Sequence, residues 1–332
     1  MATQDRLEAA RAGDESAFEA LIASHRAELH AHCYRMLGSV HDADDAMQDT
    51  MLRAWRAIGR FEGRSSLRSW FYTIATNVCL TQLQRRPKRV LPLDYGPAAA
   101  GDEPPGRPVV ESVWVEPYPD ELIGLQDGYA APEARYEQRE GIELAFIAAL
   151  QHLPARQRAV LILRDVLGFS GAEVAEALES NPASVYSALQ RAHETVDQRL
   201  PALSQQATVA SLGDARLREI VDRYVQAWEQ NDVDAVAAML TKDARLAMPP
   251  TPTWYLGRHA IATGMSGHAL SGRLKWRMTA TRANGQLAAT AHVWDDRAAT
   301  FVLHHTAVLT LRGALIDEIT AFLEPPALVP AP

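Results

Sequence analysis

The chain has 332 residues, of which 47% are hydrophobic, and this is enough for two or three domains that each have a core. Its formal net charge is −8 and its isoelectric point is near 5.8, which argues against a free-standing repressor that coats DNA electrostatically. Cys33 and Cys79 stand alone in helical contexts, so we expect buried thiols rather than a disulfide or a metal site. Neither a signal-peptide pattern nor a long apolar run occurs, so we expect a cytoplasmic protein.

The charge of the chain changes sign between Asp42 and Arg89. Four acids come first, and nine bases follow with only Glu62 opposing them: Asp42, Asp44, Asp45 and Asp49, then Arg53, Arg56, Arg60, Arg64, Arg68, Arg85, Arg86, Lys88 and Arg89. A dense basic surface can neutralise phosphates, whereas an acidic helix end suits a basic protein surface. A solvated helix with ordinary intrahelical ion pairs is the alternative interpretation. Both runs lie in one compact helical pattern, which favours a protein that joins DNA to another protein.

Two helices carry these charges. Apolar residues recur at helical spacing from Asp45 to Ile58 and again from about Ser66 to Arg86, so each helix has an inner stripe. Trp70 and Phe71 could stack on unpaired bases, but their register favours core packing. Polar side chains off the stripes have the hydrogen-bonding groups that base edges and phosphates require, namely Asn77, Gln84, Arg85 and Arg86.

The segments DADDAMQDTMLRAWRAI and RFEGRSSLRSWFYTIATNVCLTQLQRR resemble the second conserved region of bacterial RNA polymerase sigma factors of the extracytoplasmic-function group, over most of residues 14–86. In that family the first segment docks on a coiled coil of the polymerase clamp, and the following loop and helix open and read the promoter's minus ten element. The resemblance implies that Asp45, Gln48 and Asp49 bind polymerase. It implies that Arg64, Ser65, Ser66 and Arg68 form the melting loop and that Asn77 lies on the recognition helix.

Residues 142–200 predict a second helical module. Ser170 with Glu173 forms a capping-box pattern, and Asn181 with Pro182 marks the start of a last helix, so a helix-turn-helix is expected. The outward positions of the last helix would face a major groove: Ser184, Tyr186, Ser187, Gln190 and Arg191. A helical hairpin without a nucleic acid partner is the alternative.

The segment LPARQRAVLILRDVLGFSGAEVAEALESNPASVYSALQRA resembles sigma region four, which reads the minus thirty-five element. It departs from the commoner pattern at Ala188, where many relatives have an arginine. The two resemblances together imply core RNA polymerase as a partner, through its clamp coiled coil and its flap, and promoter DNA.

The stretch between the modules is rich in proline, which excludes regular helix and predicts an extended linker over residues 87–131. From residue 91 to residue 131 it has eight acids against the single base Arg107. One interpretation is that this acidity only keeps the linker disordered and soluble. The apolar string within SVWVEPYPDELI instead predicts a docking segment at Trp114, Pro117 and Tyr118, held by polymerase or by the C-terminal domain.

From Asp214 the chain predicts helices followed by strands, with a hairpin signal at Asn284-Gly285. This order indicates an α+β domain. Residues 213–324 resemble the SnoaL-like domains of the NTF2-like superfamily, and the whole order resembles sigma factors that carry such a domain as an extension. That superfamily includes ketosteroid isomerases and polyketide cyclases, so catalysis has to be weighed.

Six side chains could line a ligand pocket in this domain: Trp254, Tyr255, His268, Trp276, His292 and Trp294. Asp295 or Asp296 could act as a base, but both lie in an evident turn. His304 and His305 are adjacent in an expected strand and should point to opposite faces, so no metal site is indicated. We expect no cofactor and no enzymatic activity. Whether the C-terminal domain binds a small ligand is left open by the sequence.

The sequence therefore predicts a multidomain fold. All-α sigma region 2 and helix-turn-helix region 4 modules precede an α+β NTF2-like cone with a curved antiparallel sheet. The expected segments are 1–86, the linker 87–131, 132–203 and 213–324. We expect a sigma factor regulated in cis by its C-terminal domain. The alternatives are an NTF2-like isomerase or hydrolase with a DNA-binding appendage and a ligand-responsive one-component regulator.

Overall fold

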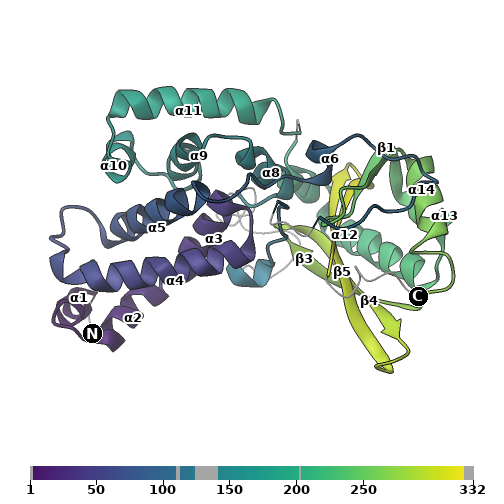
Figure 1. Cartoon of the computed structure of the whole chain (residues 1–332), viewed down its shortest axis with the longest axis horizontal. Helices are drawn as coiled ribbons and strands as arrows, with labels where there is room; N and C mark the ends of the chain where they lie inside the picture. Colours follow the sequence, from purple (N-terminus) through teal and green to yellow (C-terminus); the bar gives the residue numbers. More distant parts are fainter. Residues whose placement is uncertain (1–2, 110–112, 124–140, 202, 325–332) are drawn as a thin grey trace. The chain divides into compact units, whose positions relative to one another are not determined.

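The computed structural model describes residues 3–109, 113–123, 141–201 and 203–324 (Figure 1). The chain forms two compact units. In described residues, the helical unit comprises 3–88, 121–123 and 145–200, and the cone unit comprises 89–109, 113–120, 141–144, 201 and 203–324.

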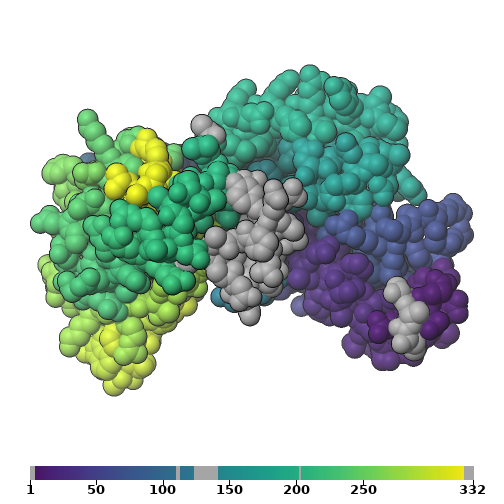
Figure 2. Space-filling view, turned by 180° about the vertical axis from the view of Figure 1, so that it is seen from behind, coloured from purple at the N-terminus to yellow at the C-terminus, as the bar shows by residue number. Residues whose placement is uncertain are grey.

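The α-helices of the helical unit have between 7 and 18 residues. Its elements are α1 (Thr3–Arg11), α2 (Glu15–Ala23), α3 (Arg26–Leu37), α4 (Val40–Ala57), the 3₁₀ turn η1 (Ile58–Arg60), α5 (Leu67–Leu83), α8 (Leu144–Gln151), α9 (Ala155–Leu161), the π-helical turn η3 (Ile162–Val166), α10 (Gly171–Ala177) and α11 (Pro182–Asp197). A further 3₁₀ turn, η2, spans Asp120–Ile123. Helix α9 packs on α3 and α5, and α10 packs on α5, so the later helices of this unit rest directly on the earlier ones (Figure 2).

An aromatic core holds the first helices together. Phe18 lies 5.2 Å from Trp55 and 6.4 Å from Phe71, measured between ring centroids. Phe71 is fully buried, which confirms the expected core role, and Trp70 is half-buried against Phe71 at 5.3 Å. Cys33 and Cys79 are free, buried thiols, as expected.

The helix-turn-helix has the capping that the sequence indicates. The Ser170 hydroxyl accepts from the Glu173 amide, and the Glu173 carboxylate accepts from the Ser170 amide, which completes the capping box. The Asn181 side chain caps α11, whose first residue is Pro182. Both expectations are confirmed, and the two caps fix where α10 and α11 begin.

The cone unit packs helices on one curved sheet. Its elements are α6 (Pro92–Tyr95), α12 (Gln205–Glu229), α13 (Val233–Met239), β1 (Leu240–Ala247), β2 (Trp254–Leu256), α14 (Arg258–Gly267), β3 (Trp276–Ala283), β4 (Gln286–Asp295), β5 (Thr300–Arg312) and β6 (Leu315–Leu323). The strand order is β2-β1-β6-β5-β4-β3, antiparallel except for the parallel β1–β6 pair. Asn284 and Gly285 both have positive φ and close the β3–β4 hairpin, as predicted. The expected fold class is confirmed.

Helix α12 begins earlier than the sequence suggested. The sequence predicted helix only from Asp214, whereas the residues after Ser204 already form the first turns of α12, which bends at Gly213 with φ 73°. The Ser204 hydroxyl caps this start, and the Glu143 carboxylate accepts from the amides of Gln205 and Gln206 at 3.0 and 2.8 Å. The expectation failed because the stabilising acid lies some sixty residues away in sequence.

Candidate protein and nucleic-acid interfaces

Helix α4 presents the acidic face that was expected to bind protein. Asp45, Gln48 and Asp49 are all exposed on one side of this helix. Asp42 differs, because it is buried and forms an ion pair with Arg86. Arg86 also lies 3.7 Å from Asp45, so this expected DNA contact is engaged with the acidic face. The remaining acidic side chains present a compact anionic surface.

The loop before α5 is basic and ends in a helix cap. Arg64 is exposed and pairs with Glu62, which is exposed as well. Ser65 is half-buried, and the Ser66 hydroxyl accepts from the Ser69 amide at 3.0 Å. Ser66 is therefore the N-cap of α5, and the positive end of that helix lies beside the basic loop.

Arg68, in the first turn of α5, is held on three sides. Its guanidinium carbon lies 4.9 Å from the centroid of the Tyr72 ring and 5.0 Å from that of the Phe169 ring. Arg68 Nε donates to Glu28 at 3.3 Å, and the Tyr72 hydroxyl donates to the same carboxylate oxygen at 3.3 Å. Burial raises the pKa of Tyr72, so its hydroxyl stays protonated. This expected DNA contact is thus engaged with Phe169, from the segment that leads into α10.

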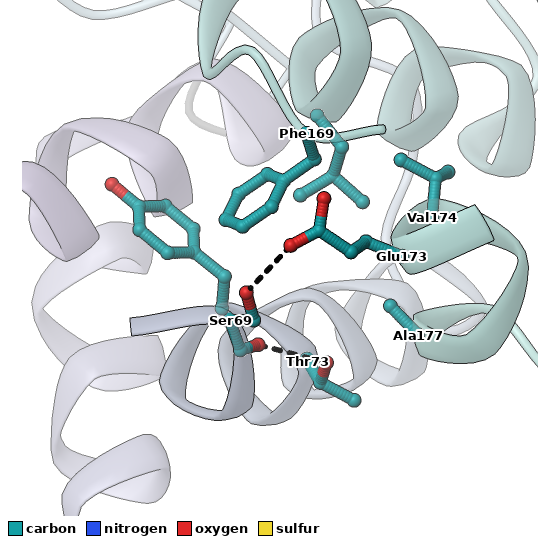
Figure 3. Close-up of a pocket in the computed structure, with 8 residues that line it drawn as sticks. Ser69, Thr73, Phe169, Glu173, Val174 and Ala177 are labelled. Carbon is teal, nitrogen blue, oxygen red and sulfur yellow. Dashed lines mark hydrogen bonds between the residues drawn. The ribbon is translucent and has the colours of Figure 1, made fainter. Parts of the chain in front are cut away.

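A small pocket separates α5 from α10 (Figure 3). Its free volume of about 10 Å³ leaves room for at most about one water molecule. Its lining residues are Ser69, Tyr72, Thr73, Leu163, Phe169, Glu173, Val174 and Ala177. Ser69 Oγ donates to Glu173 Oε1 at 3.3 Å across it. Hydrogen bonds, first of all those from Ser170, lower the pKa of Glu173, so this carboxylate is ionised. The first turn of α5 therefore faces an anion and an aromatic ring.

The other expected DNA contacts lie on exposed surfaces of α5 and α11. These side chains are Asn77, Gln84 and Arg85 on and just after α5, and Ser184, Tyr186, Ser187, Gln190 and Arg191 on α11. Tyr186 is 71% exposed, although Val185, Ala192 and Val196 beside it in the helix are buried. The helix register therefore turns the expected reading positions outward, where they are open to a partner.

A buried arginine that the sequence did not single out connects α9 to α3. Arg158 donates to the Met36 carbonyl, to the Gln151 side chain at 2.5 Å and to the Leu153 carbonyl at 3.3 Å. Gln151 in turn donates to the Arg35 carbonyl at 3.3 Å. Burial lowers the pKa of Arg158 to about 10, so it stays charged. No pattern in the segment LPARQRAV separates this arginine from solvated ones.

The linker segment that was expected to dock packs within the cone unit. The Tyr118 amide donates to the Asn284 side chain at 2.9 Å, and the Asn284 amide donates to the Tyr118 carbonyl at 2.8 Å. Tyr118 is fully buried and Pro117 is half-buried. The Trp114 carbonyl accepts from Arg89 at 2.5 Å, and Trp114 is buried as well. Of the expected docking surfaces, the C-terminal domain is the one that these contacts involve.

The β3–β4 turn is held from a second direction. Asn284 Nδ2 donates to the Ile142 carbonyl at 2.8 Å, and the Gly285 amide donates to Asp120 Oδ1 at 2.8 Å. Asp120 also pairs with Arg282 at 3.2 Å. We call these contacts, with those of Tyr118 to Asn284, the hairpin clasp. They bring Tyr118 and Asp120 of the linker and Ile142, just before α8, to one turn.

The six side chains expected to line a pocket are not brought together. The Trp254 indole donates to the Gly96 carbonyl at 2.8 Å, and the Tyr255 hydroxyl donates to the Glu103 carbonyl at 2.7 Å, so both contact the linker. His268 is exposed after α14 and Trp276 is buried in the core. His292 and Trp294 are half-buried near the far end of β4, where the Trp294 ring lies 5.3 Å from that of Phe301.

His304 and His305 lie on the same side of the sheet, so the expectation of opposite faces is wrong. The β4–β5 register shifts between Ala291 and His292, and this irregularity breaks the strict alternation of side chains. The two imidazoles are joined by a hydrogen bond between their Nδ1 atoms at 2.9 Å. Both rings lie within 6.0 Å of the Trp276 ring. A regular strand would have separated them.

The two carboxylates considered as catalytic bases, those of Asp295 and Asp296, accept hydrogen bonds within the β4–β5 turn. Asp295 Oδ1 accepts from the amides of Arg297 and Ala298 at 2.7 and 3.0 Å, and Asp296 accepts from the Trp294 indole at 2.9 Å. Both acids therefore have a structural role in the turn.

Three family models match the chain: Sigma-70 region 2 at residues 21–89, Sigma-70 region 4 at residues 143–195 and a SnoaL-like domain at residues 221–319. The ECF RNA polymerase sigma factor SigG of Mycobacterium tuberculosis is 40% identical over 318 residues, which cover 95% of this chain and 82% of that protein. The RNA polymerase sigma-H factor of Pseudomonas aeruginosa is 28% identical over 61% of this chain and 96% of its own.

Among solved structures, the extracytoplasmic function sigma factor SigJ of Mycobacterium tuberculosis matches with a TM-score of 0.57 and 20% identity. The match covers 94% of this chain and 97% of that one, so the two chains share a fold. Among the described residues, no helix has both the length and the apolar character needed to cross a membrane.

The paired histidines predict an acid-sensitive cone unit. Burial lowers the pKa of His304 to about 4 and that of His305 to about 3, below the value near 6.5 of an unfolded chain. The unfolded state thus binds more protons as the pH falls below about 6.5, and the stability contributed by the neutral rings is lost toward pH 4 to 3. We expect the free energy of unfolding to fall by up to about 1.4 kcal/mol per pH unit for each histidine in this window.

This expectation is checked by urea unfolding between pH 7 and pH 4, followed by tryptophan fluorescence. His305→Gln should flatten the pH dependence, whereas His268→Gln, at an exposed position, should not change it. An unchanged slope in His305→Gln would show that His305 is already charged in the folded protein.

Proposed function

We propose, from the premise that the chain belongs to the extracytoplasmic-function sigma factors of RNA polymerase, that α4 binds the polymerase core while α5 and α11 read promoter DNA. The family resemblance expected from the sequence is confirmed, and with it the role of directing RNA polymerase to promoters with a SnoaL-like domain attached. This is a regulatory role. The observation that carries the residue assignments is the outward position of both sets of side chains, acidic on α4 and polar on α5 and α11.

The polymerase contact is assigned to the exposed acids of α4. Asp45 and Asp49 lie one helical turn apart on the exposed side of α4, together with Gln48. The buried side of the same helix is formed by Ala46, Met47 and Thr50. A basic surface on the clamp coiled coil of the polymerase core would complement this acidic face. The polymerase flap would bind the other module, which contains α10 and α11. Both acids are exposed, and the 3.7 Å contact between Asp45 and Arg86 is a surface ion pair that contributes little to stability, so the fold should not depend on them.

Asp45→Lys and Asp49→Lys should therefore weaken core binding at least tenfold each while the helical content is retained, because each replaces an attractive charge by a repulsive one. Affinity is measured by titrating labelled protein with core polymerase, with circular dichroism as the check of folding. Asp222→Lys, at an exposed acid of α12, is the matched control and should bind normally. Normal binding by both α4 variants would contradict the assignment.

The two reading helices should make separable contributions. Asn77→Ala should change minus ten preference or opening, and Gln190→Ala should change use of the minus thirty-five element, since a good bidentate base contact contributes about 1 to 3 kcal/mol of discrimination. Run-off transcription on promoter libraries randomised in one element at a time measures both. If both variants keep the parental base preferences, the two helices are wrongly assigned.

We further propose that the cone unit controls the sigma modules in cis through the linker. The hairpin clasp holds Tyr118, Asp120 and Ile142 at one turn of the cone, and Trp254 and Tyr255 bind the carbonyls of Gly96 and Glu103 nearer the start of the connection. Residues 89–144 are the connection between the two DNA-reading modules. A linker held by the cone restricts how far the modules separate, and polymerase, or a small ligand of the cone, would shift that equilibrium by differential binding.

Asn284→Ala tests this control, because its side chain serves both Tyr118 and Ile142. Losing two buried hydrogen bonds should destabilise the clasp by about 2 to 4 kcal/mol and change transcript yield at equal protein concentration. Asn231→Ala, whose side chain contacts the Leu274 carbonyl within the cone, is the control for general destabilisation. Equal yields from the parent, Asn284→Ala and a Tyr118→Ala variant would rule out regulation through the linker.

A further inference from the structure

The first turn of α5 has the chemistry of a nucleotide site. Its N-terminus offers amides and the Ser69 hydroxyl, which suit a phosphate, and the ring of Tyr72 with the guanidinium of Arg68 offers flat surfaces for a base. The basic loop with Arg64 adjoins it. Under the assignments made above, this turn belongs to the part of the protein that meets unpaired promoter DNA.

In the free protein this surface is occupied by the chain itself. The Arg68 guanidinium carbon lies over the Phe169 ring, 5.0 Å from its centroid, as it would lie over a base, and the Tyr72 ring meets the Phe169 ring edge to face at 5.4 Å. The Glu173 carboxylate accepts from Ser69, as a phosphate oxygen would, and it is ionised (Figure 3). Both groups come from one short segment at the start of α10, in the module that reads the other promoter element.

This contact is incompatible with reading both elements at once. The minus ten and minus thirty-five elements lie about 25 base pairs apart, which is roughly 80 Å along the duplex at 3.4 Å per pair. Helix α11, with 16 residues, is only about 24 Å long and follows α10 after one turn. The segment from Phe169 to Glu173 must therefore leave α5 before α11 can reach its own element.

We propose that Phe169 and Glu173 mimic a nucleotide and block the promoter surface formed by Ser66, Arg68, Ser69 and Tyr72 until polymerase separates the modules. The inference rests on the assignment of α5 to promoter DNA made above. The new element is that the module expected to read the minus thirty-five element covers, in the free protein, the α5 surface expected to bind the minus ten element. Arg68 is the group for which the DNA and Phe169 compete.

Two variants test the contact in the full chain. Phe169→Leu keeps an apolar side chain but removes the ring, and Glu173→Gln removes the charge while keeping a residue that suits a capping box. Losing the aromatic and cation–π contacts should raise amide exchange in residues 67–73 about fivefold, and Glu173→Gln should raise it as well. Glu176→Gln, at an exposed position of the same helix, is the control and should match the parent.

Binding of a random 20-nucleotide single-stranded DNA pool, measured by fluorescence anisotropy without polymerase, tests the mimicry. Phe169→Leu and Glu173→Gln should bind about fivefold more tightly than the parent, and adding Arg68→Ala should abolish the gain. Unchanged exchange and unchanged DNA binding in both variants would overturn the proposal. Raised exchange without tighter DNA binding would also overturn it, because the contact would then hold the modules without covering a DNA site.

Run-off transcription distinguishes a failure of this inference from a failure of the assignments on which it rests. If Asn77→Ala alters minus ten preference while the Phe169 and Glu173 variants behave like the parent, α5 reads DNA and only the mimicry is wrong. If Asn77→Ala leaves promoter preference unchanged, the assignment of α5 fails whatever the exchange data show.

Discussion

Backbone groups at buried helix ends and turns need hydrogen-bond partners, and this protein supplies them from distant parts of the sequence. The last carbonyls of α3 are satisfied by Arg158 and Gln151, more than a hundred residues further on. The first amides of α12 are satisfied by Glu143, some sixty residues earlier. A cation at a helix C-terminus and an anion at a helix N-terminus also complement the helix dipoles. Each compact unit is thus defined by its long-range caps as well as by its apolar core.

The same constraint makes the linker a structural part of the cone unit. An acidic, proline-rich segment has few backbone partners of its own, and its described residues find them on the Asn284-Gly285 turn and on Trp254 and Tyr255. Two of the side chains that suggested a ligand pocket, Trp254 and Tyr255, thereby serve the linker. The C-terminal domain therefore binds the chain between the sigma modules through ordinary hydrogen bonds.

Local signals in the sequence predicted the local features well. The capping box at Ser170, the cap at Asn181 and the turn at Asn284 each depend on residues within four positions, and all three were found as expected. Features that depend on distant partners were missed, such as the burial of Arg158 and the helical start of α12. The placement of His304 and His305 failed for another reason, because a register shift at Ala291 leaves no clear sequence pattern.

The energetics of Arg158 bear on whether the helical unit can open. Its acceptors are three backbone carbonyls and one amide oxygen, all neutral, so its burial loses hydration without gaining a full ion pair. Its lowered pKa expresses that cost directly. Such a contact specifies one arrangement of α9 on α3 but adds little net stability to that arrangement, because the guanidinium regains its hydration when the two helices separate. The hydration regained on release thus offsets part of what the hydrogen bonds of Arg158 contribute, which is compatible with the separation of the modules proposed above.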